Sequence, residues 1–289
     1  MFQTISNFMR VRDIRNKIIF TLLMLIVFRI GTFIPVPNVD ANVLKAVNEF
    51  NIVGFLNTFG GGALANFSIF AMGIMPYITA SIIVQLLQMD VVPKFAEWSK
   101  QGEVGRRKLA QFTRYFTIVL GFIQSFAMSY GFNAMYGGTL IKDTSIGSYL
   151  TIAIVLTAGT AFLLWLAEQI TAYGVGNGIS IIIFAGIVAA MPNAVNQLYA
   201  QKIEGADDQL FLNIVILLLL LLIILAIVVG VIYVQQALRK IPIQYAKRVA
   251  GRGQATVGAQ QSPLPLKVNA AGVIPVIFAM AFLVMPQTL

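Results

Sequence analysis

Charged side chains are absent from long stretches of this 289-residue chain. Six such stretches each exceed the roughly 20 residues that a helix needs to cross the hydrocarbon core of a bilayer. They are Phe50–Met89, Tyr115–Ile141, Thr144–Ala167, Gln169–Gln201, Gln209–Leu238 and Val268–Leu289. A seventh apolar stretch, Ile18–Ile34, is interrupted only by Arg29. With 58% apolar and 11% charged residues, the chain has too little charge to cover a water-facing surface.

The apolar runs show no polar alternation, so they do not fit the wall of a membrane barrel. We therefore predict an all-α integral membrane protein, a multi-span helical bundle. The predicted spans have apolar centres near 18–34, 70–89, 112–132, 149–168, 178–192, 211–234 and 268–286.

Lys and Arg are distributed unevenly between the two ends of these spans. If the N-terminus is cytoplasmic, four lie in the N-terminal tail, six in Lys94–Arg114 and six in Arg239–Lys267, whereas only Lys45, Lys142 and Lys202 lie outside. Cytoplasmic loops of membrane proteins carry such an excess of positive charge. The sequence thus predicts a multi-pass protein with a cytoplasmic N-terminus.

The composition excludes much of enzyme chemistry. The chain has no Cys and no His, so it offers no disulfide, no thiolate or imidazole metal ligand and no histidine base. No Asp or Glu lies in the middle of a predicted span, which weighs against proton or sodium coupling. We expect no catalytic residue, no metal and no cofactor, and we do not expect an enzyme.

The uncharged stretch Phe50–Met89 is too long for one span, because 40 helical residues would measure about 60 Å. Gly60-Gly61-Gly62 supplies a break, followed by a possible half-helix over Ala63–Phe70. Such a segment has to be covered by protein or lie in a wet cavity. It is either a re-entrant plug at the mouth of a pathway or an interfacial loop with three glycines.

Several single residues in the predicted spans allow two structural interpretations each. Arg29 either snorkels to the interface or pairs with a loop carboxylate. Pro76 and Pro275 mark either hinges or static kinks. The mid-span glycines are most simply close-packing positions, and three more glycines form a turn into the fifth span. These glycines are Gly121, Gly159, Gly186 and Gly230, and then Gly174, Gly176 and Gly178.

The cytoplasmic stretch Gln235–Lys267 is longer than a connection between spans requires. It is basic, carries no acidic residue and contains flexible glycines. We favour a docking site for an anionic partner, RNA, acidic protein or anionic lipid, over a solvated loop. The candidate docking residues are Arg239, Lys240, Tyr245, Lys247, Arg248 and Arg252.

Five short motifs along the chain closely resemble the SecY family, the pore subunits of the bacterial Sec protein-conducting channel. They are Phe28-Arg29-Ile30-Gly31 through Ile34-Pro35-Val36-Pro37, Gly73-Ile74-Met75-Pro76-Tyr77-Ile78, Gly176-Asn177-Gly178-Ile179-Ser180, Tyr245-Ala246-Lys247-Arg248, and Leu266-Lys267-Val268-Asn269 with Ala271-Gly272-Val273-Ile274-Pro275. The likeness runs in order over essentially the whole chain.

The resemblance implies a fold of ten spans in two inverted halves of five. Residues 1–172 would form spans one to four of the first half, with a plug at about 57–67. Residues 173–192 would form span five, and residues 193–289 would begin the second half with spans six and seven and the basic loop 235–267. The family has three further spans, so we expect this chain to be a truncated one.

The resemblance also implies a constriction ring and a plug. The ring residues are Ile78, Ile82, Ile179, Ile183 and Ile277. The plug residues are Asn57, Gly60, Gly61, Gly62, Ala63, Leu64, Asn66 and Phe67. Positions i and i+4 share a helix face, so each Ile pair can point at one axis, and an aliphatic ring offers ions no replacement for their hydration.

By the same resemblance, the protein would pass unfolded secretory polypeptides across the bacterial cytoplasmic membrane. Spans two, three and seven would flank a lateral gate that releases signal sequences and membrane helices into lipid. SecE and SecG would be partner subunits, and the basic loop would contact the SecA motor or the ribosome. A secondary solute transporter is the alternative, because broken helices are typical of transporters as well.

Overall fold

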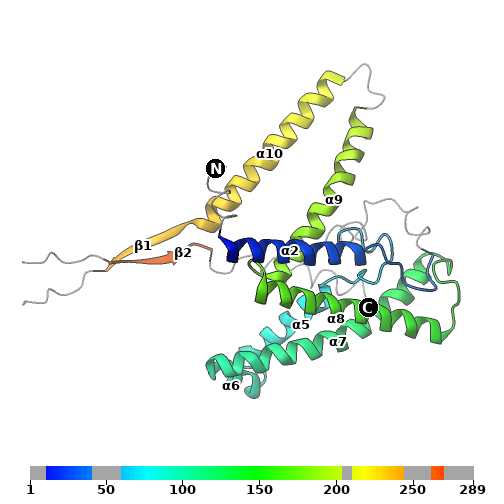
Figure 1. Ribbon diagram of the computed structural model, residues 1–289, viewed down its shortest axis with the longest axis horizontal. Helices are drawn as coiled ribbons and strands as arrows, with labels where there is room; N and C mark the ends of the chain where they lie inside the picture. Colours follow the sequence, from blue (N-terminus) through cyan, green and yellow to red (C-terminus); the bar gives the residue numbers. More distant parts are fainter. Residues whose placement is uncertain (1–10, 41–59, 204–209, 244–261, 270–289) are drawn as a thin grey trace, which may run out of the picture. The chain divides into compact units, whose positions relative to one another are not determined.

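The computed structural model describes residues 11–40, 60–203, 210–243 and 262–269 (Figure 1). The chain divides between Asn196 and Gln197 into two compact units, and each is described by itself. The seventh predicted span, with Pro275 and Ile277, lies outside the described residues. The domain boundaries that the sequence predicts at residues 173 and 193 stay predictions.

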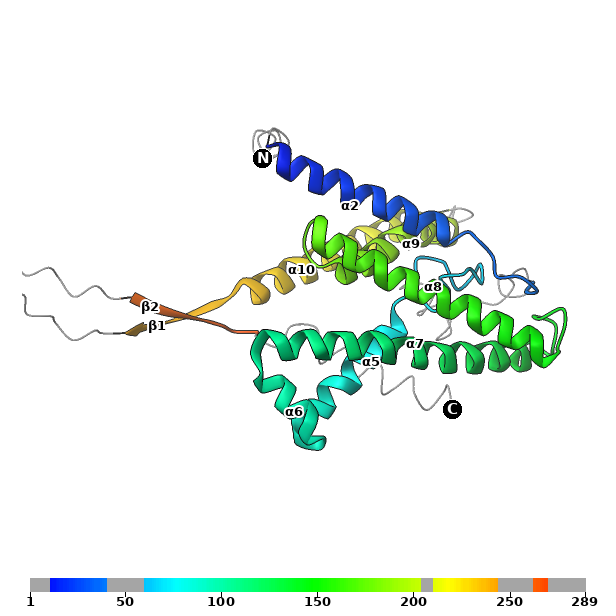
Figure 2. The same cartoon turned by 60° about the horizontal axis from the view of Figure 1, so that its bottom comes forward.

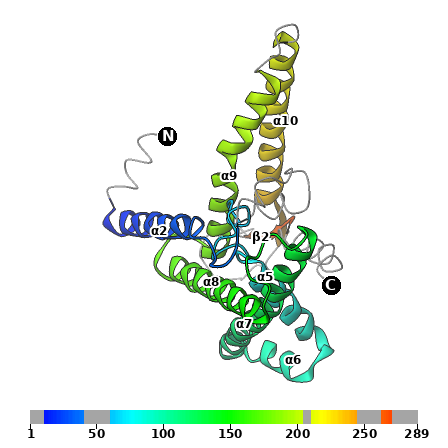
Figure 3. The same cartoon turned by 90° about the vertical axis from the view of Figure 1, so that its right-hand side faces the viewer.

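The first unit is helical. Its elements are α2 (Arg12–Gly31), α5 (Met75–Leu86), the π-helix η1 (Leu87–Val91), α6 (Pro93–Lys100), α7 (Gly102–Met135), α8 (Ile146–Tyr173) and α9, which begins at Gly178 and ends at Lys202 across the unit boundary. Helix α8 lies between α2 and α7 (Figure 2, Figure 3). Helices α5 and α6 both pack on α7.

Four helices among the described residues are long and apolar enough to cross a membrane. They are Gly102–Met135, Ile146–Tyr173, Gly178–Ala200 and Phe211–Gln236. A fifth is added if the bent pair that contains α5 and α6 counts as one span. These helices contain the predicted spans three to six. Helix α2 has 20 residues, and its first two turns carry four charges, so its apolar part is short.

Two helix boundaries differ from the prediction. Helix α9 continues through Pro192 to Lys202, because an internal proline removes one hydrogen bond without ending the helix. Helix α5 begins at Met75, so Phe70–Ile74 precede it as turns. Pro76 therefore lies in the first helical turn, where its missing N–H breaks no helical bond, and it is not a mid-span kink.

Apart from Leu109, small or polar residues at every fourth position form the buried face of α7. Such a stripe lets two helix backbones approach closely in a membrane. The buried residues are Gly105, Leu109, Thr113, Thr117, Gly121, Ser125, Ser129 and Asn133. The close-packing prediction is confirmed at Gly159, where an added Cβ would lie 1.9 Å from the Ile69 carbonyl oxygen. At Gly121 an added Cβ would make only an ordinary contact, 3.6 Å from the Pro76 side chain. No described atom lies within 4 Å of a Cβ added at Gly230, and close packing there stays a prediction.

The N-terminus of α8 is fixed by the loop that precedes it. The Ser145 hydroxyl accepts a hydrogen bond from the Ser148 backbone N–H at 3.3 Å, which is an N-cap. Asp143 accepts from the Ser145 N–H, the Ser145 hydroxyl and the Ser148 hydroxyl. These bonds, led by the one from the Ser145 side chain, lower the pKa of Asp143 below its ordinary value.

The second unit holds one long helix and a β-ribbon. Helix α10 (Leu210–Gln236) is exposed along its apolar length, as a lipid-facing helix would be. Strands β1 (Leu238–Ile243) and β2 (Ser262–Lys267) pair antiparallel, with Leu238 opposite Lys267. The described residues are mostly helical, as the predicted fold class requires, and this ribbon is a small addition within the basic loop. Both strands are edges, so their prolines do not break a central ladder.

Candidate constriction and plug

Residues Gly60–Phe67, here called the plug segment, are turns. The half-helix expected over Ala63–Phe70 is not formed, because Phe67 inside it has a positive φ of 40°, which a right-handed helix does not admit. Gly61 and Gly62, also with positive φ, form the predicted break before it. Protein covers the segment as expected: Ala63 and Phe67 are 0% exposed and Leu64 is 2% exposed. Asn57, the first predicted plug residue, lies outside the described residues.

The C-terminal end of the plug segment is joined to the chain that follows α2. The Val36 N–H donates to the Phe67 carbonyl and the Ile69 N–H donates to the Ile34 carbonyl, both at 3.0 Å. Pro35 and Ser68 form the isolated antiparallel bridge between these bonds. The pairing satisfies backbone groups that would otherwise be buried without a partner.

Several predicted ring residues gather around one apolar cluster that includes the plug segment. The core of this cluster, here called the plug cluster, consists of Phe28, Ala63, Phe70, Ile74, Leu163, Leu166, Ala167, Ile170 and Ile182. Ile78 of α5 and Ile179 and Ile183 of α9 pack against it, and each is half-buried. Ile82 is 7% exposed but does not belong to this cluster.

The plug segment also touches α9 through its backbone. A Cβ added to Gly61 would lie 3.0 Å from the Gly186 Cα, a distance that real Cβ atoms rarely show. Gly186 is buried in α9, three residues beyond Ile183. Glycine at both positions therefore lets the two backbones meet, which confirms the close-packing prediction for Gly186.

The turn between α8 and α9 sets the direction of the helix that carries Ile179 and Ile183. Gly176 has a φ of 70°, and a Cβ on Gly178 would lie 1.9 Å from the Ala167 carbonyl oxygen. The Asn177 carboxamide oxygen accepts from the N–H groups of Ile179 and Ser180 at 3.0 and 3.4 Å. The predicted turn into the fifth span is confirmed.

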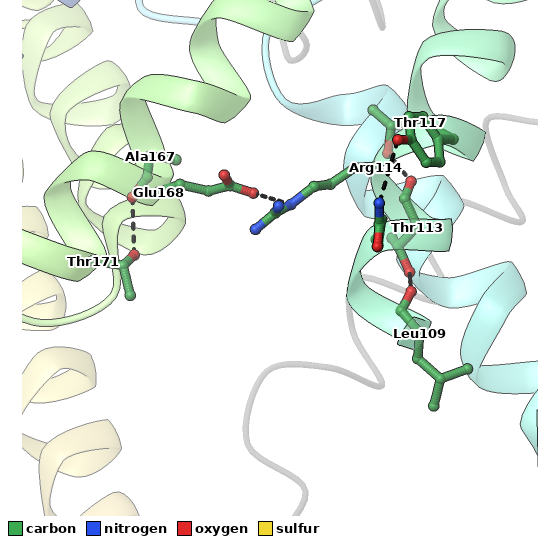
Figure 4. A network of polar contacts seen from close by, with 9 residues as sticks. Leu109, Thr113, Arg114, Thr117, Ala167, Glu168 and Thr171 are labelled. Carbon is green, nitrogen blue, oxygen red and sulfur yellow. Dashed lines mark hydrogen bonds and ion pairs between the residues drawn. The ribbon is translucent and has the colours of Figure 1, made fainter. Parts of the chain in front are cut away.

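An ion pair joins α7 to α8 at the ends predicted to be cytoplasmic. Arg114 Nε lies 2.5 Å from Glu168 Oε1 (Figure 4). The Arg114 side chain is 51% exposed and the Glu168 side chain 35%, so the pair contributes about 1 kcal/mol or less to stability. Beside it, the Thr113 hydroxyl donates to the Leu109 carbonyl within α7. The ion pair links α7 to α8, and the hydroxyl group of Thr113 beside it is bonded within its own helix.

The described docking residues lie on the β-ribbon. Arg239 and Lys240 are exposed on β1. Lys240 opposes Pro265, so Lys240 and Lys267 lie diagonally on one face of the ribbon. Tyr245, Lys247, Arg248 and Arg252 lie outside the described residues.

Sequence reasoning missed the partners of the plug segment. Arg29 neither snorkels alone nor meets a described carboxylate: its Nη1 donates to the Gly61 carbonyl at 2.6 Å. The available signal was a cation inside an apolar span. The acceptor could not be identified from the sequence, because it is a backbone carbonyl, which every residue carries. The pairing of Ile34–Val36 with Phe67–Ile69 likewise joins segments that are far apart in sequence.

The sequence is similar to those of known proteins over its whole length. The chain is 73% identical over 289 residues to the protein translocase subunit SecY of Bacillus licheniformis, and 69% identical over 290 residues to that of Bacillus subtilis. Both matches cover the whole chain, and they cover 66% and 67% of the relatives. The chain thus spans about two thirds of the length of these curated relatives.

Solved structures share the fold at low identity. The structure described as that of a protein conducting channel has a TM-score of 0.58 and 21% identity, and the match covers 95% of this chain and 57% of that one. Sec61 in the canine ribosome-channel complex gives a TM-score of 0.56 at 20% identity, with coverage of 95% and 58%. The SecY family model matches residues 68–289. The chain therefore belongs to the SecY family.

Proposed function

We propose that this chain is the larger part of the central subunit of a protein-conducting channel. The complete protein passes unfolded secretory polypeptides across the bacterial cytoplasmic membrane and releases apolar helices sideways into lipid. Its N-terminus is cytoplasmic, as the distribution of Lys and Arg predicts. The names of the relatives support this function, since both are protein translocase subunits.

The observation that carries the proposal is the plug cluster. Three predicted ring residues from two separate helices pack against a cluster that also contains Ala63 of the plug segment. An aliphatic constriction provides no ligand for an ion and favours loss of water. It also makes no sequence-specific contact with a polypeptide, so chains of many sequences pass. The five isoleucines remain our proposed ring, with Ile277 as its fifth member.

The plug segment closes this constriction in the resting channel. Its Ala63, Leu64 and Phe67 side chains are buried, and its backbone is held near both ends, by Arg29 and by the strand-like pairing with Ile34–Val36. A solved structure of the same fold is described as showing that the SecY plug domain stabilises the closed state and maintains a membrane seal. We extend that role to residues 57–67 of this chain.

The driving partner docks on the basic loop 235–267. The ribbon places Lys240 and Lys267 on one face, and the rest of the loop adds three cations and no acidic residue. This charge suits an acidic protein surface or RNA phosphate. SecA or the ribosome would supply the driving force, and SecE and SecG would be the partner subunits.

Reconstitution tests the proposed function directly. A full-length SecY that contains this sequence is placed in lipid vesicles with its partner subunits and SecA, and the uptake of a preprotein is measured. We expect uptake that depends on the signal sequence of the preprotein and on ATP. Gradient-driven uptake of a small solute, with no preprotein transport, would instead support a secondary transporter.

Reversing Arg248 and Arg252 to Glu should weaken binding of SecA or ribosomes by about threefold to tenfold at low salt, because exposed ion pairs contribute about 0.2–1 kcal/mol each. The difference should shrink as salt rises, since exposed charges are screened. The measurement is a binding titration at two ionic strengths. Lys142→Glu, on the predicted opposite side of the membrane, is the control, and equal binding of the double variant at low salt argues against the dock.

A further inference from the structure

Arg29 carries a permanent charge near the C-terminal end of α2, where neighbouring side chains are apolar. Its guanidinium lies 4.7 Å from the centre of the Phe33 ring and so makes a cation–π contact. Its Nη1 donates a hydrogen bond to the Gly61 carbonyl oxygen, 32 residues away, at 2.6 Å. A short hydrogen bond from an ionised donor is among the strong ones.

The acceptor is a carbonyl that the backbone of the plug segment leaves to a side chain. Ala63 N–H donates to the Gly60 carbonyl and Asn66 N–H donates to the Gly62 carbonyl, both at 3.3 Å. The carbonyl between them receives Arg29. Because Gly61 has a φ of 65°, its peptide group turns out of the pattern that a helix would impose.

The bond lies where the plug segment meets α9. Gly61 is the residue whose backbone approaches Gly186, and Ala63, two residues on, belongs to the plug cluster. The other end of the segment is held independently by the pairing of Phe67 and Ile69 with Val36 and Ile34. Arg29 therefore acts on the N-terminal end of the described segment, next to the predicted ring.

We propose that Arg29 is a positioning residue that latches the plug segment in the closed channel; this inference rests on the proposed function. The hydrogen bond is strong while the site is dry, because electrostatic interactions grow as the local dielectric falls. When a polypeptide enters and water follows, water solvates both the guanidinium and the Gly61 carbonyl. The hydrogen bond thus stabilises the closed state, and little free energy is lost by its absence once the pore is filled with water.

A thiol at Ala63 reports the latch, because residues 1–289 contain no cysteine and Ala63 is 0% exposed. In membrane vesicles with the full-length subunit and its partners, the Ala63→Cys thiol is labelled with N-ethylmaleimide. We expect Arg29→Met to label about tenfold faster than the parent, since a hydrogen bond to a charged group contributes more than a neutral one. Arg29→Lys, which keeps a charged donor, should fall between the two.

The matched control is Ala80→Cys, a 0% exposed position on α5, whose labelling should stay slow in every background. If Arg29→Met also speeds the labelling of Ala80→Cys, the variant has loosened the fold, and Phe33→Leu becomes the test of the latch. Phe33 is 59% exposed, so its replacement leaves the core intact. We expect Phe33→Leu to speed Ala63→Cys labelling by about twofold to fivefold. Parental labelling rates in both variants overturn the latch.

This result is separable from the proposed function. Removal of residues 57–67 tests whether the segment seals the channel, whatever holds it. A channel that leaks after that deletion but labels at the parental rate in Arg29→Met has a plug and no Arg29 latch. A channel that does not leak after the deletion contradicts the proposed plug itself.

Discussion

Deletion of residues 57–67 should raise the resting ion conductance of the reconstituted channel by about tenfold or more. The estimate follows from what holds the plug segment: Leu64 and Phe67 are nearly fully buried, and burial of each such side chain contributes about 1.5–3 kcal/mol. A docking free energy of that size keeps the undocked state below about 1% of the channels. After the deletion every channel is in the unsealed state, and only the proposed isoleucine ring still opposes the passage of ions.

The measurement is single-channel or bulk conductance in planar bilayers without substrate. Leu64→Ala provides a graded version, because truncating a buried leucine costs about 2–5 kcal/mol of packing. It should leak more than the parent and less than the deletion. Ile123→Ala is the control, since Ile123 is 57% exposed on α7. Equal conductance of parent and deletion removes the plug assignment.

The helices that the sequence predicts well are those whose apolar runs end at charges or polar turns. Helices α8 and α10 extend only a few residues beyond the predicted centres 149–168 and 211–234. Their hydropathy is high, and no competing backbone arrangement is available to such a segment in lipid. Charge placement and apolar length therefore decide these spans without tertiary information.

The start of α5 was not predictable in the same way. Phe70–Ile74 are as apolar as the helix that follows, but Gly73, with a φ of 55°, interrupts the helical path just before α5. Phe70 is stacked against Phe28 and Phe162, with ring centroids 6.2 and 6.0 Å away. These contacts bring together residues that are distant in sequence, so composition and periodicity do not report them.

The features of the candidate site likewise fall into two groups, those identified from the sequence and those found only in the structure. The Ile positions were identified by resemblance, and the glycine break was identified from the length of the uncharged stretch Phe50–Met89. In the structure, Ile78, Ile179 and Ile183 pack around one cluster. The Arg29 bond to Gly61 and the pairing of Pro35 with Ser68 depend on backbone groups, which every residue carries. Sequence distinguishes side chains, so contacts made by carbonyls and N–H groups are found only in the fold.

Gly159 offers a test of that fold where α8 supports the chain between the plug segment and α5. A Cβ at Gly159 would lie 1.9 Å from the Ile69 carbonyl oxygen and 2.8 Å from the Ile69 carbonyl carbon. Both atoms belong to the backbone, so no side-chain rotation relieves the overlap. The Ile69 N–H is itself bonded to the Ile34 carbonyl, which limits how far this strand can retreat.

Gly159→Ala should therefore lower the melting temperature of the purified complex by about 5 °C or more, because overpacking costs about 1–3 kcal/mol and often exceeds that against backbone. Gly131→Ala in α7 is the matched control: no atom of the described residues lies within 4 Å of its added Cβ, and alanine favours a helix over glycine by about 1 kcal/mol. The same preparations should show a raised resting conductance for Gly159→Ala alone, since displacing Ile69 pulls on Ser68 and the end of the plug segment. A Gly159→Ala channel that melts and conducts like the parent would mean that α8 does not approach Ile69 as closely as described, and the support of the plug segment would have to come from α2 and α9 alone.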